Sequence, residues 1–206
     1  MDLQDRNELR ELKKRLRKET LAKRKALAEE TPLLFEEFSS KIIETLKLTD
    51  EYKKARTIMV FVSFEDEVMT HQFIKDALAD GKNVYVPHIL KLEKLMVPAQ
   101  IFDFDKDLKP GYYGILSPIE DQVQIKDPAE IDLVVTPGVL FDERGYRIGY
   151  GAGFYDRFFS KLDSDVPKIG LGFSLQQTKE VPIDQFDIPI HALITENGIT
   201  VFRQPK

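Results

Sequence analysis

The sequence of 206 residues contains no cysteine. This absence excludes disulfide bonds, thiolate nucleophiles and metal sites built on cysteine. Histidine is scarce as well, and His71, His88 and His191 do not have the spacing of a histidine metal site. No Gly-x-Ser-x-Gly sequence occurs, so the nucleophile motif of an α/β serine hydrolase is also missing. The residues therefore offer no convincing nucleophile for covalent catalysis.

The sequence also lacks a long hydrophobic run. No stretch approaches the roughly 20 apolar residues that cross a bilayer, and residues 1–14 are charged where a secretory signal would be apolar. The composition, 42% hydrophobic and 32% charged, is typical of a globular protein with a buried core. We therefore expect a cytoplasmic protein that has no membrane partner.

Charge is distributed unevenly along the chain. The net charge is −5, but residues 6–25 hold ten Lys or Arg and three Glu, a local excess of seven positive charges. Such a run is most often the solvated face of a helix, and it also suits the binding of phosphate groups or nucleic acid. The acidity of the remaining chain argues against an extended nucleic-acid footprint, so no nucleic-acid partner is expected. A local site for a small polyanion stays open.

Hydrophobic spacing predicts alternating helices and strands. Leu9, Leu12 and Leu16 recur at i, i+3 and i+7 in a helix over residues 7–29. Thr31-Pro32 then has the pattern of a helix start, and this second helix ends near Leu48. The other expected elements are helices at 70–81 and 153–160 and strands at 57–63, 83–86, 95–101, 131–136, 168–173, 191–195 and 199–202.

Capping and turn residues predict several boundaries. Thr70 is expected to cap the helix that follows it, and Pro87 is expected to end the strand at 83–86. Proline and glycine signals mark residues 110–118 as loops. The strand–helix–strand unit within residues 57–86 predicts a parallel pair of strands.

The alternation of strands and helices predicts an α/β fold, a three-layer α/β/α arrangement with a mostly parallel central sheet. We find no internal repeat and no linker long enough to separate domains. Residues 1–206 are therefore expected to form a single domain. Nothing in the sequence indicates an obligate interface, and a monomer is expected.

The most informative segment is a glycine-rich stretch at residues 136–157, which holds five of the eleven glycines. It follows a predicted buried strand, and ligands of open α/β sheets bind beyond the carboxyl ends of strands. Glycines permit close backbone approach, and successive N–H groups bind anions. Arg147 adds positive charge, and Tyr150, Phe154 and Tyr155 offer flat faces to a heterocycle. The spacing matches neither the dinucleotide fingerprint nor the Walker A loop.

Over residues 137–157 this stretch reads P-G-x-x-F-D-x-x-G-x-R-I-G-x-G-x-G-F-Y-D-R. The run resembles the signature of the 5-formyltetrahydrofolate cyclo-ligase family, also called methenyltetrahydrofolate synthetases. The resemblance extends over nearly the whole chain. Its other parts are Lys13-x-x-Leu16-Arg17, residues 62–70, Phe173-x-x-Gln176 and Val181-Pro182 with Asp187.

The resemblance implies roles for named residues. It places Lys13 and Arg17, which share one helix face as i and i+4, on the phosphates of ATP. The full implied ATP set is Lys13, Arg17, Arg147, Gly149, Gly151, Gly153 and Tyr155. The implied folate set is Val62, Glu67, Tyr150, Phe154 and Tyr155, and the implied Mg²⁺ ligands are Asp156 and Asp187.

Two positions depart from the family pattern, which usually has glycine or lysine at position 152 and often tyrosine at position 154. Here they hold Ala152 and Phe154. A methyl group at 152 narrows the loop if the backbone there needs a positive φ. Phe154 keeps a stacking face but has no hydroxyl.

The activity implied by the resemblance is the ATP- and Mg²⁺-dependent closure of 5-formyltetrahydrofolate to 5,10-methenyltetrahydrofolate in one-carbon metabolism, with release of ADP and phosphate. It needs no covalent intermediate with the protein. From the residues alone, two alternatives stay open. One is a sugar-phosphate isomerase or CoA-transferase-like enzyme that does not use ATP, and the other is a non-catalytic folate- or nucleotide-binding module.

Overall fold

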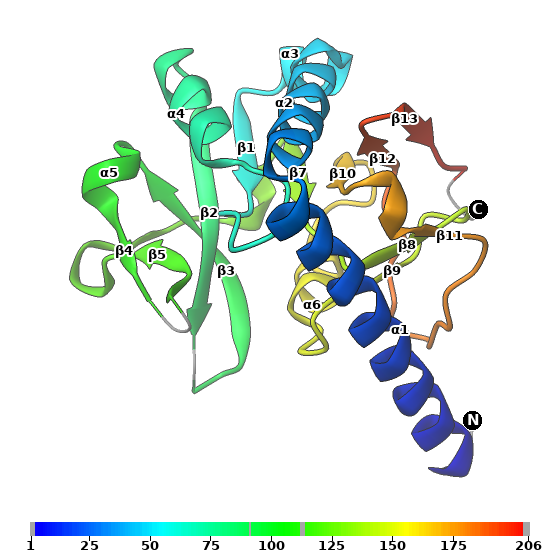
Figure 1. The fold of residues 1–206 in the computed structure, drawn as a ribbon. Coiled ribbons are helices and arrows are strands. Elements are labelled where there is room, and N and C mark those ends of the chain that lie inside the picture. The colour runs from blue at the N-terminus through cyan, green and yellow to red at the C-terminus, as the bar shows by residue number, and fades with distance from the viewer. Residues whose placement is uncertain (1–2, 91, 112–113, 204–206) are drawn as a thin grey trace.

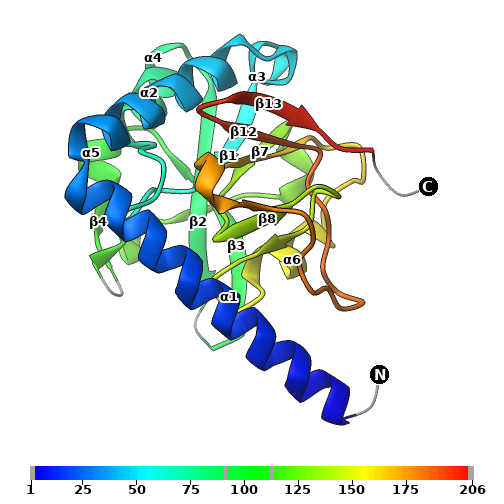
Figure 2. The same ribbon diagram turned by 45° about the vertical axis from the view of Figure 1, so that its right-hand side comes forward.

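The computed structural model describes residues 3–90, 92–111 and 114–203. Two helices open the chain, and the amino-terminal part of α1 projects beyond the rest of the molecule (Figures 1 and 2). The helices are α1 (Leu3–Glu30), α2 (Pro32–Leu48), α3 (Asp50–Lys54), α4 (His71–Ala79), α5 (Phe104–Asp107) and α6 (Phe154–Phe159), with 3-10 turns η2 (Glu120–Gln122), η3 (Pro128–Glu130) and η4 (Ser174–Gln176). Among the described residues, every helix is too short or too polar to cross a bilayer.

The central sheet of the described residues has eight strands in the order β13-β12-β10-β7-β1-β2-β3-β6. From β12 to β2 all neighbours pair in parallel, while β13, β3 and β6 are antiparallel additions at the two edges. In sheet order the strands are Gly198–Val201, Ala192–Thr195, Lys168–Leu171, Leu133–Thr136, Thr57–Val60, Asn83–Leu90, Leu95–Ile101 and Gln124–Ile125. The prediction of a mostly parallel sheet is confirmed.

Apolar side chains project from both faces of this sheet, so helices can pack against both faces. On β1, Ile58 and Val60 join one core cluster with α2 and α4, whereas Met59 between them joins a second cluster with Phe158 and Phe159 of α6. Alternate residues of a strand point to opposite faces, and the continuous apolar run of β1 therefore requires cover on each side. This arrangement is the predicted three-layer α/β/α fold.

The cap predicted at Thr70 is wrong, although α4 begins at the expected residue. The Thr70 hydroxyl makes no cap; it donates to the Phe61 carbonyl at 2.8 Å and accepts the Ser63 N–H at 2.9 Å. The Thr70 N–H in turn donates to Ser63 Oγ at 3.0 Å. The competing partners lie just past β1, so Thr70 closes residues 61–70 into a loop.

Two further boundaries differ from the prediction. Strand β2 continues through Pro87 to Leu90, because its parallel pairing with β1 ends at Tyr85 and Pro87 lies opposite Pro98 of β3. A proline is tolerated where no ladder hydrogen bond is needed from its nitrogen. Of the residues 110–118 predicted as loops, Pro110 and Leu116–Pro118 belong to a small antiparallel pair, β4 (Leu108–Pro110) with β5 (Leu116–Pro118). Residues 112–113 lie outside the described residues.

Helix α2 supplies a matched test of the core, since it carries one leucine that is fully buried and another that is 70% exposed, Leu46 and Leu48. Leu46→Ala should lower the free energy of unfolding by about 2–5 kcal/mol through lost burial and a cavity. Leu48→Ala should change it by less than about 0.5 kcal/mol. Urea denaturation at constant m-value measures both, and equal losses would contradict this assignment of the core.

Candidate active site

One face of α1 lies across the glycine-rich segment. Arg17 Nε donates to the Gly149 carbonyl at 2.8 Å, and Lys13 Nζ donates to Asp187 Oδ2 at 2.5 Å. Lys13 and Arg17 are one helical turn apart and so reach neighbouring parts of the chain. The structure thus brings together three of the regions that the sequence predicted to share a site.

Other basic residues of α1 point to solvent. The side chains of Lys14, Arg15 and Lys25 are 73%, 69% and 67% exposed, and among the described residues their ion-pair partners are glutamates of the same helix. Exposed pairs of this kind contribute little to stability. The reading of the basic run as a solvated face therefore holds for these three residues, and phosphate binding by Lys13 and Arg17 stays a prediction.

The glycine-rich segment begins as a hairpin held by Asp142. Strands β8 (Leu140–Asp142) and β9 (Arg147–Ile148) pair in antiparallel, with β11 (Gln177–Thr178) beside β8. The buried Asp142 carboxylate accepts the backbone N–H groups of Arg144, Tyr146 and Val181 at 2.9–3.1 Å, and Arg144 also binds it through the side chain. Asp142 was not among the predicted site residues, although it belongs to the run that resembles the family signature.

Beyond the hairpin, the lack of a side chain at Gly151 allows Arg17 of α1 to lie close to the backbone of the segment. Gly151 has a φ of +107°, and a Cβ built there would lie 3.2 Å from Arg17 Nη2. Ala152 is exposed and is absent from the described non-glycine residues with positive φ. Its methyl group is therefore accommodated without backbone strain.

Arg147 lies behind the loop in a buried position. Its Nη1 donates to the Ile188 carbonyl at 3.0 Å and lies 3.3 Å from Asp156 Oδ1, while its guanidinium stands 4.6 Å from the centre of the Phe159 ring. Burial lowers the pKa of Arg147, and the negative charge of Asp156 opposes that effect. Arginine stays protonated in proteins, so a fixed positive charge lies next to the segment 149–153.

The two predicted metal ligands lie close to one another along this edge. Asp156 Oδ1 accepts the N–H of Ile188 at 3.2 Å, next to Asp187 in the chain, and Asp187 Oδ2 accepts the N–H of Asp184 at 2.8 Å. The described residues contain no group of three or more acids or histidines that could enclose a metal ion. Mg²⁺ commonly uses one or two carboxylates with water and phosphate oxygens, so this pair fits it.

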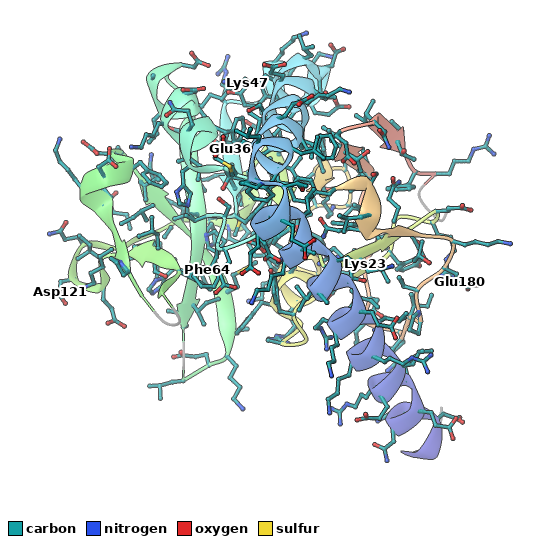
Figure 3. All side chains as sticks on the ribbon, viewed as in Figure 1. Lys23, Glu36, Lys47, Phe64, Asp121 and Glu180 are labelled. Atoms are coloured by element: carbon teal, nitrogen blue, oxygen red, sulfur yellow. The ribbon has the colours of Figure 1, made fainter. Side chains whose placement is uncertain are left out.

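A buried polar network joins α1, the turn after β1 and the glycine-rich segment. Figure 3 labels Phe64, which belongs to this turn. Tyr150 Oη donates to Glu67 Oε1 at 2.8 Å, and the N–H of Phe64 donates to Glu67 Oε2 at 3.0 Å. Arg24 Nη2 donates to both Tyr150 Oη and Asp66 Oδ1 at 2.7 Å. Glu67 and Tyr150, both predicted to bind folate, are thus in direct contact.

Arg24 and Asp66 were not among the predicted site residues. Arg24 does have a signal in the helical spacing, because it follows Arg17 by seven residues and Lys13 by eleven, which places all three on one face of a helix. Asp66 lies in a turn and has no comparable signal. Glu67 could also have been a solvated turn acid, but the structure leaves it only 7% exposed.

The apolar residues of the predicted folate set lie in or against the hydrophobic core, not in this polar network. Val62 is buried in the core cluster shared with α2 and α4. Tyr155 is half-buried and packs against both core clusters. Phe154, the first residue of α6, packs against the second core cluster, and the Arg157 guanidinium lies 5.2 Å from its ring centre.

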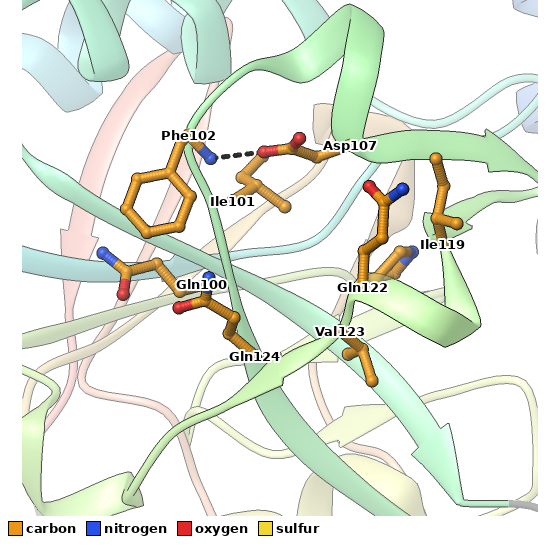
Figure 4. Close-up of a pocket in the computed structure, with 9 residues that line it drawn as sticks. Gln100, Ile101, Phe102, Asp107, Ile119, Gln122, Val123 and Gln124 are labelled. Carbon is orange, nitrogen blue, oxygen red and sulfur yellow. Dashed lines mark hydrogen bonds between the residues drawn. The ribbon is translucent and has the colours of Figure 1, made fainter.

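Two surface hollows lie at the opposite end of the sheet. One, of about 130 Å³, is lined by residues such as Ile101 and Gln124 (Figure 4), and Ile101 pairs with Val84 near the start of β2. The other, of about 270 Å³, is lined by residues that precede β1, β7 and β10, including Ala55, Asp132 and Pro167. Ligands of parallel sheets bind at the carboxyl ends of strands, so neither hollow coincides with the candidate site.

Gly145 and Gly149 should differ in how well they tolerate replacement by alanine. Gly145 has a φ of +87°, and a Cβ there would lie 2.7 Å from the Ile190 carbonyl oxygen, whereas a Cβ on Gly149 meets no atom within 4 Å. Gly145→Ala should cost at least about 1 kcal/mol of stability, and Gly149→Ala less than about 0.5 kcal/mol. Thermal unfolding of the two variants checks this, and a greater loss for Gly149→Ala would refute it.

Comparison with known proteins identifies the family of the chain. The model of the 5-formyltetrahydrofolate cyclo-ligase family matches residues 9–196. The 5-formyltetrahydrofolate cyclo-ligase of Haemophilus influenzae is 30% identical, over 70% of this chain and 78% of that protein. A probable 5-formyltetrahydrofolate cyclo-ligase of Caenorhabditis elegans is 32% identical, over 84% of this chain and 87% of that protein.

A solved structure gives the same result for the fold. The NMR structure of Aquifex aeolicus 5,10-methenyltetrahydrofolate synthetase superposes with a TM-score of 0.80 at 30% identity and covers 95% of each chain. The family model spans residues 9–30 of α1, the 61–70 loop, the glycine-rich segment and Asp187, which are the regions that converge in the candidate site. The chain belongs to the 5-formyltetrahydrofolate cyclo-ligase family.

Proposed function

We propose that the protein cyclises 5-formyltetrahydrofolate to 5,10-methenyltetrahydrofolate with ATP and Mg²⁺, as a ligase of folate one-carbon metabolism. The observation that carries this proposal is the contact of Arg17 with the Gly149 carbonyl at 2.8 Å. It sets the basic face of α1 against the glycine-rich segment, and the same segment meets Glu67 through Tyr150. A triphosphate site and a folate site would therefore share one loop.

The nucleotide half of the site consists of cations around a glycine backbone. Lys13 and Arg17 from α1 and Arg147 from behind the loop would neutralise the phosphates, and the N–H groups of Gly149, Gly151 and Gly153 would bind phosphate oxygens. Tyr155 lies within reach of the Arg147 charge, 5.8 Å from ring centre to guanidinium. Lys13 pairs with Asp187 in this structure, so the phosphates would compete with that carboxylate for Lys13.

Asp156 and Asp187 would hold the Mg²⁺ ion that accompanies ATP. When bound, the ion neutralises charge that develops on the phosphoryl group during transfer. Each aspartate is oriented by a backbone N–H bond to one oxygen, from Ile188 and Asp184. The residues thus present carboxylates in fixed orientations, which suits an ion that keeps several water ligands.

The folate half of the site is built around Glu67. Its carboxylate would accept N–H groups of the pterin and orient the formyl group, while the half-exposed Tyr150 ring would offer a stacking face. Val62, Phe154 and Tyr155 would contribute apolar surface. These roles are assigned by the family pattern and are supported by the direct contact between Glu67 and Tyr150.

In the proposed reaction the formyl oxygen attacks the γ-phosphorus of ATP and ADP leaves. N10 then adds to the activated formyl carbon and loses its proton, and the C–O bond breaks to release phosphate and the methenyl product. The protein's contribution is to align the formyl oxygen with the phosphorus and to exclude water. No step needs a protein nucleophile.

The activity is tested with purified protein, ATP, MgCl₂ and 5-formyltetrahydrofolate. The near-ultraviolet absorbance of the methenyl product should rise with equimolar formation of ADP. Omitting ATP, or removing Mg²⁺ with a chelator, should abolish both signals. Product formation without ATP, or binding of folate without any turnover in the complete mixture, would contradict the proposal.

Arg17 and Arg15 provide a matched pair for the nucleotide site. Arg17→Met should raise KM for ATP about tenfold or more, because a charge-assisted hydrogen bond is lost. Arg15→Met removes the same charge from the exposed face of α1 and should leave KM nearly unchanged. Steady-state kinetics with unfolding controls measures both, and equal shifts in KM would show that only the net charge of α1 matters.

A further inference from the structure

Arg24 is the most deeply buried basic residue on the inner face of α1, 2% exposed. One of its nitrogens, Nη2, donates to two acceptors that come from different segments. Asp66 belongs to the turn after β1 and Tyr150 to the glycine-rich segment, and both distances are 2.7 Å. Arg24 therefore ties the folate side of the candidate site to the loop that serves its nucleotide side.

The chemistry of these groups fixes the direction of each hydrogen bond. A guanidinium only donates, so the Tyr150 oxygen accepts from Arg24 and directs its own proton to Glu67 Oε1 at 2.8 Å. Glu67 Oε2 accepts the N–H of Phe64. With both oxygens accepting, Glu67 is arranged as an ionised carboxylate.

Burial opposes that ionised state. It raises the pKa of Glu67, and the positive charge of Arg24 is the first of the effects that lower it again, followed by the Tyr150 and Phe64 hydrogen bonds. The other groups that act on this carboxylate are Asp66 in the same turn, which raises its pKa, and Tyr155 of α6. Arg24 is thus the positive charge that lowers the pKa of Glu67.

A role in helix packing alone explains Arg24 poorly. Its Nε is buried and has no hydrogen-bond partner among the described residues, so the guanidinium is desolvated without full compensation. An apolar side chain would fill such a position at lower cost. The residue is better explained by what its charge does to its neighbours.

Building on the proposed cyclisation, we infer that Arg24 is a positioning residue: it fixes the Tyr150 hydroxyl on Glu67 and keeps the Glu67 carboxylate ionised to bind the folate. It acts through Tyr150 and Glu67 rather than on the reacting atoms. Its loss should then affect folate binding in a pH-dependent way.

The test follows the titration of Glu67 directly, by ¹³C NMR of protein labelled at glutamate Cδ, with the Glu67 signal assigned by its loss in Glu67→Gln. In Arg24→Met the midpoint should move up by about one pH unit, a tenfold gain in proton affinity. Lys23→Met, the same change at the exposed neighbouring position, should leave the midpoint unchanged. An unchanged midpoint in Arg24→Met would overturn the inference.

Two conservative variants keep the test decisive if Arg24→Met does not fold. Arg24→Lys retains the charge and should largely restore the midpoint, and Tyr150→Phe should raise it by less than Arg24→Met. If neither follows this order in folded protein, the inference is wrong. Far-UV circular dichroism establishes folding.

Kinetics then separates this inference from the proposed function. In Arg24→Met, KM for 5-formyltetrahydrofolate should rise about tenfold, most strongly at low pH, with a smaller change in kcat and in KM for ATP. If the unmodified protein has no cyclo-ligase activity, the proposed function fails even where the NMR shift is present. If it is active and Arg24→Met matches Lys23→Met in both readouts, only the inference fails.

Discussion

The candidate site depends on one face of α1 lying across the glycine-rich segment. Lys13, Arg17 and Arg24 reach three separate partners, the carboxylate of Asp187, the carbonyl of Gly149 and the network at Tyr150. A straight helix fixes the distances between its residues, so these three contacts also fix the three partner segments relative to one another. The exposed face of the same helix carries similar charges, and in the described part of the chain Lys14, Arg15 and Lys25 pair with glutamates of α1 itself.

Much of this could be predicted from the sequence, because the signals were local and periodic. The long helix, the buried β1 and β7 and the parallel pair β1–β2 follow from hydrophobic spacing and short connections. The glycine-rich segment was recognisable from its spacing, and Gly145, Gly151 and Gly153 do adopt positive φ values. The resemblance to the cyclo-ligases added the residue roles, which the periodicity alone could not give.

What could not be predicted were contacts between residues far apart in the chain. Arg24 is 42 residues from Asp66 and 126 from Tyr150, and neither pairing has a local signature. Thr70 failed as a predicted cap over a shorter separation, because its hydroxyl donates to the Phe61 carbonyl, nine residues away, instead of capping α4. A side chain with several possible partners is decided by the fold, so propensity indicates where an element begins but not which bonds close it.

Two arginines lie next to residues 149–153, and they are held in different ways. Arg147 is buried and fixed by a carbonyl and a carboxylate, whereas Arg17 is only half-buried and its one described bond is to the Gly149 carbonyl. Burial lowers the pKa of both, which means that both charges are desolvated before any ligand arrives. A polyanion on this loop would therefore meet cations with part of their hydration already removed, and electrostatic attraction is strongest under that condition. The arrangement favours a ligand with several negative charges over a single carboxylate, which Lys13 already has in Asp187.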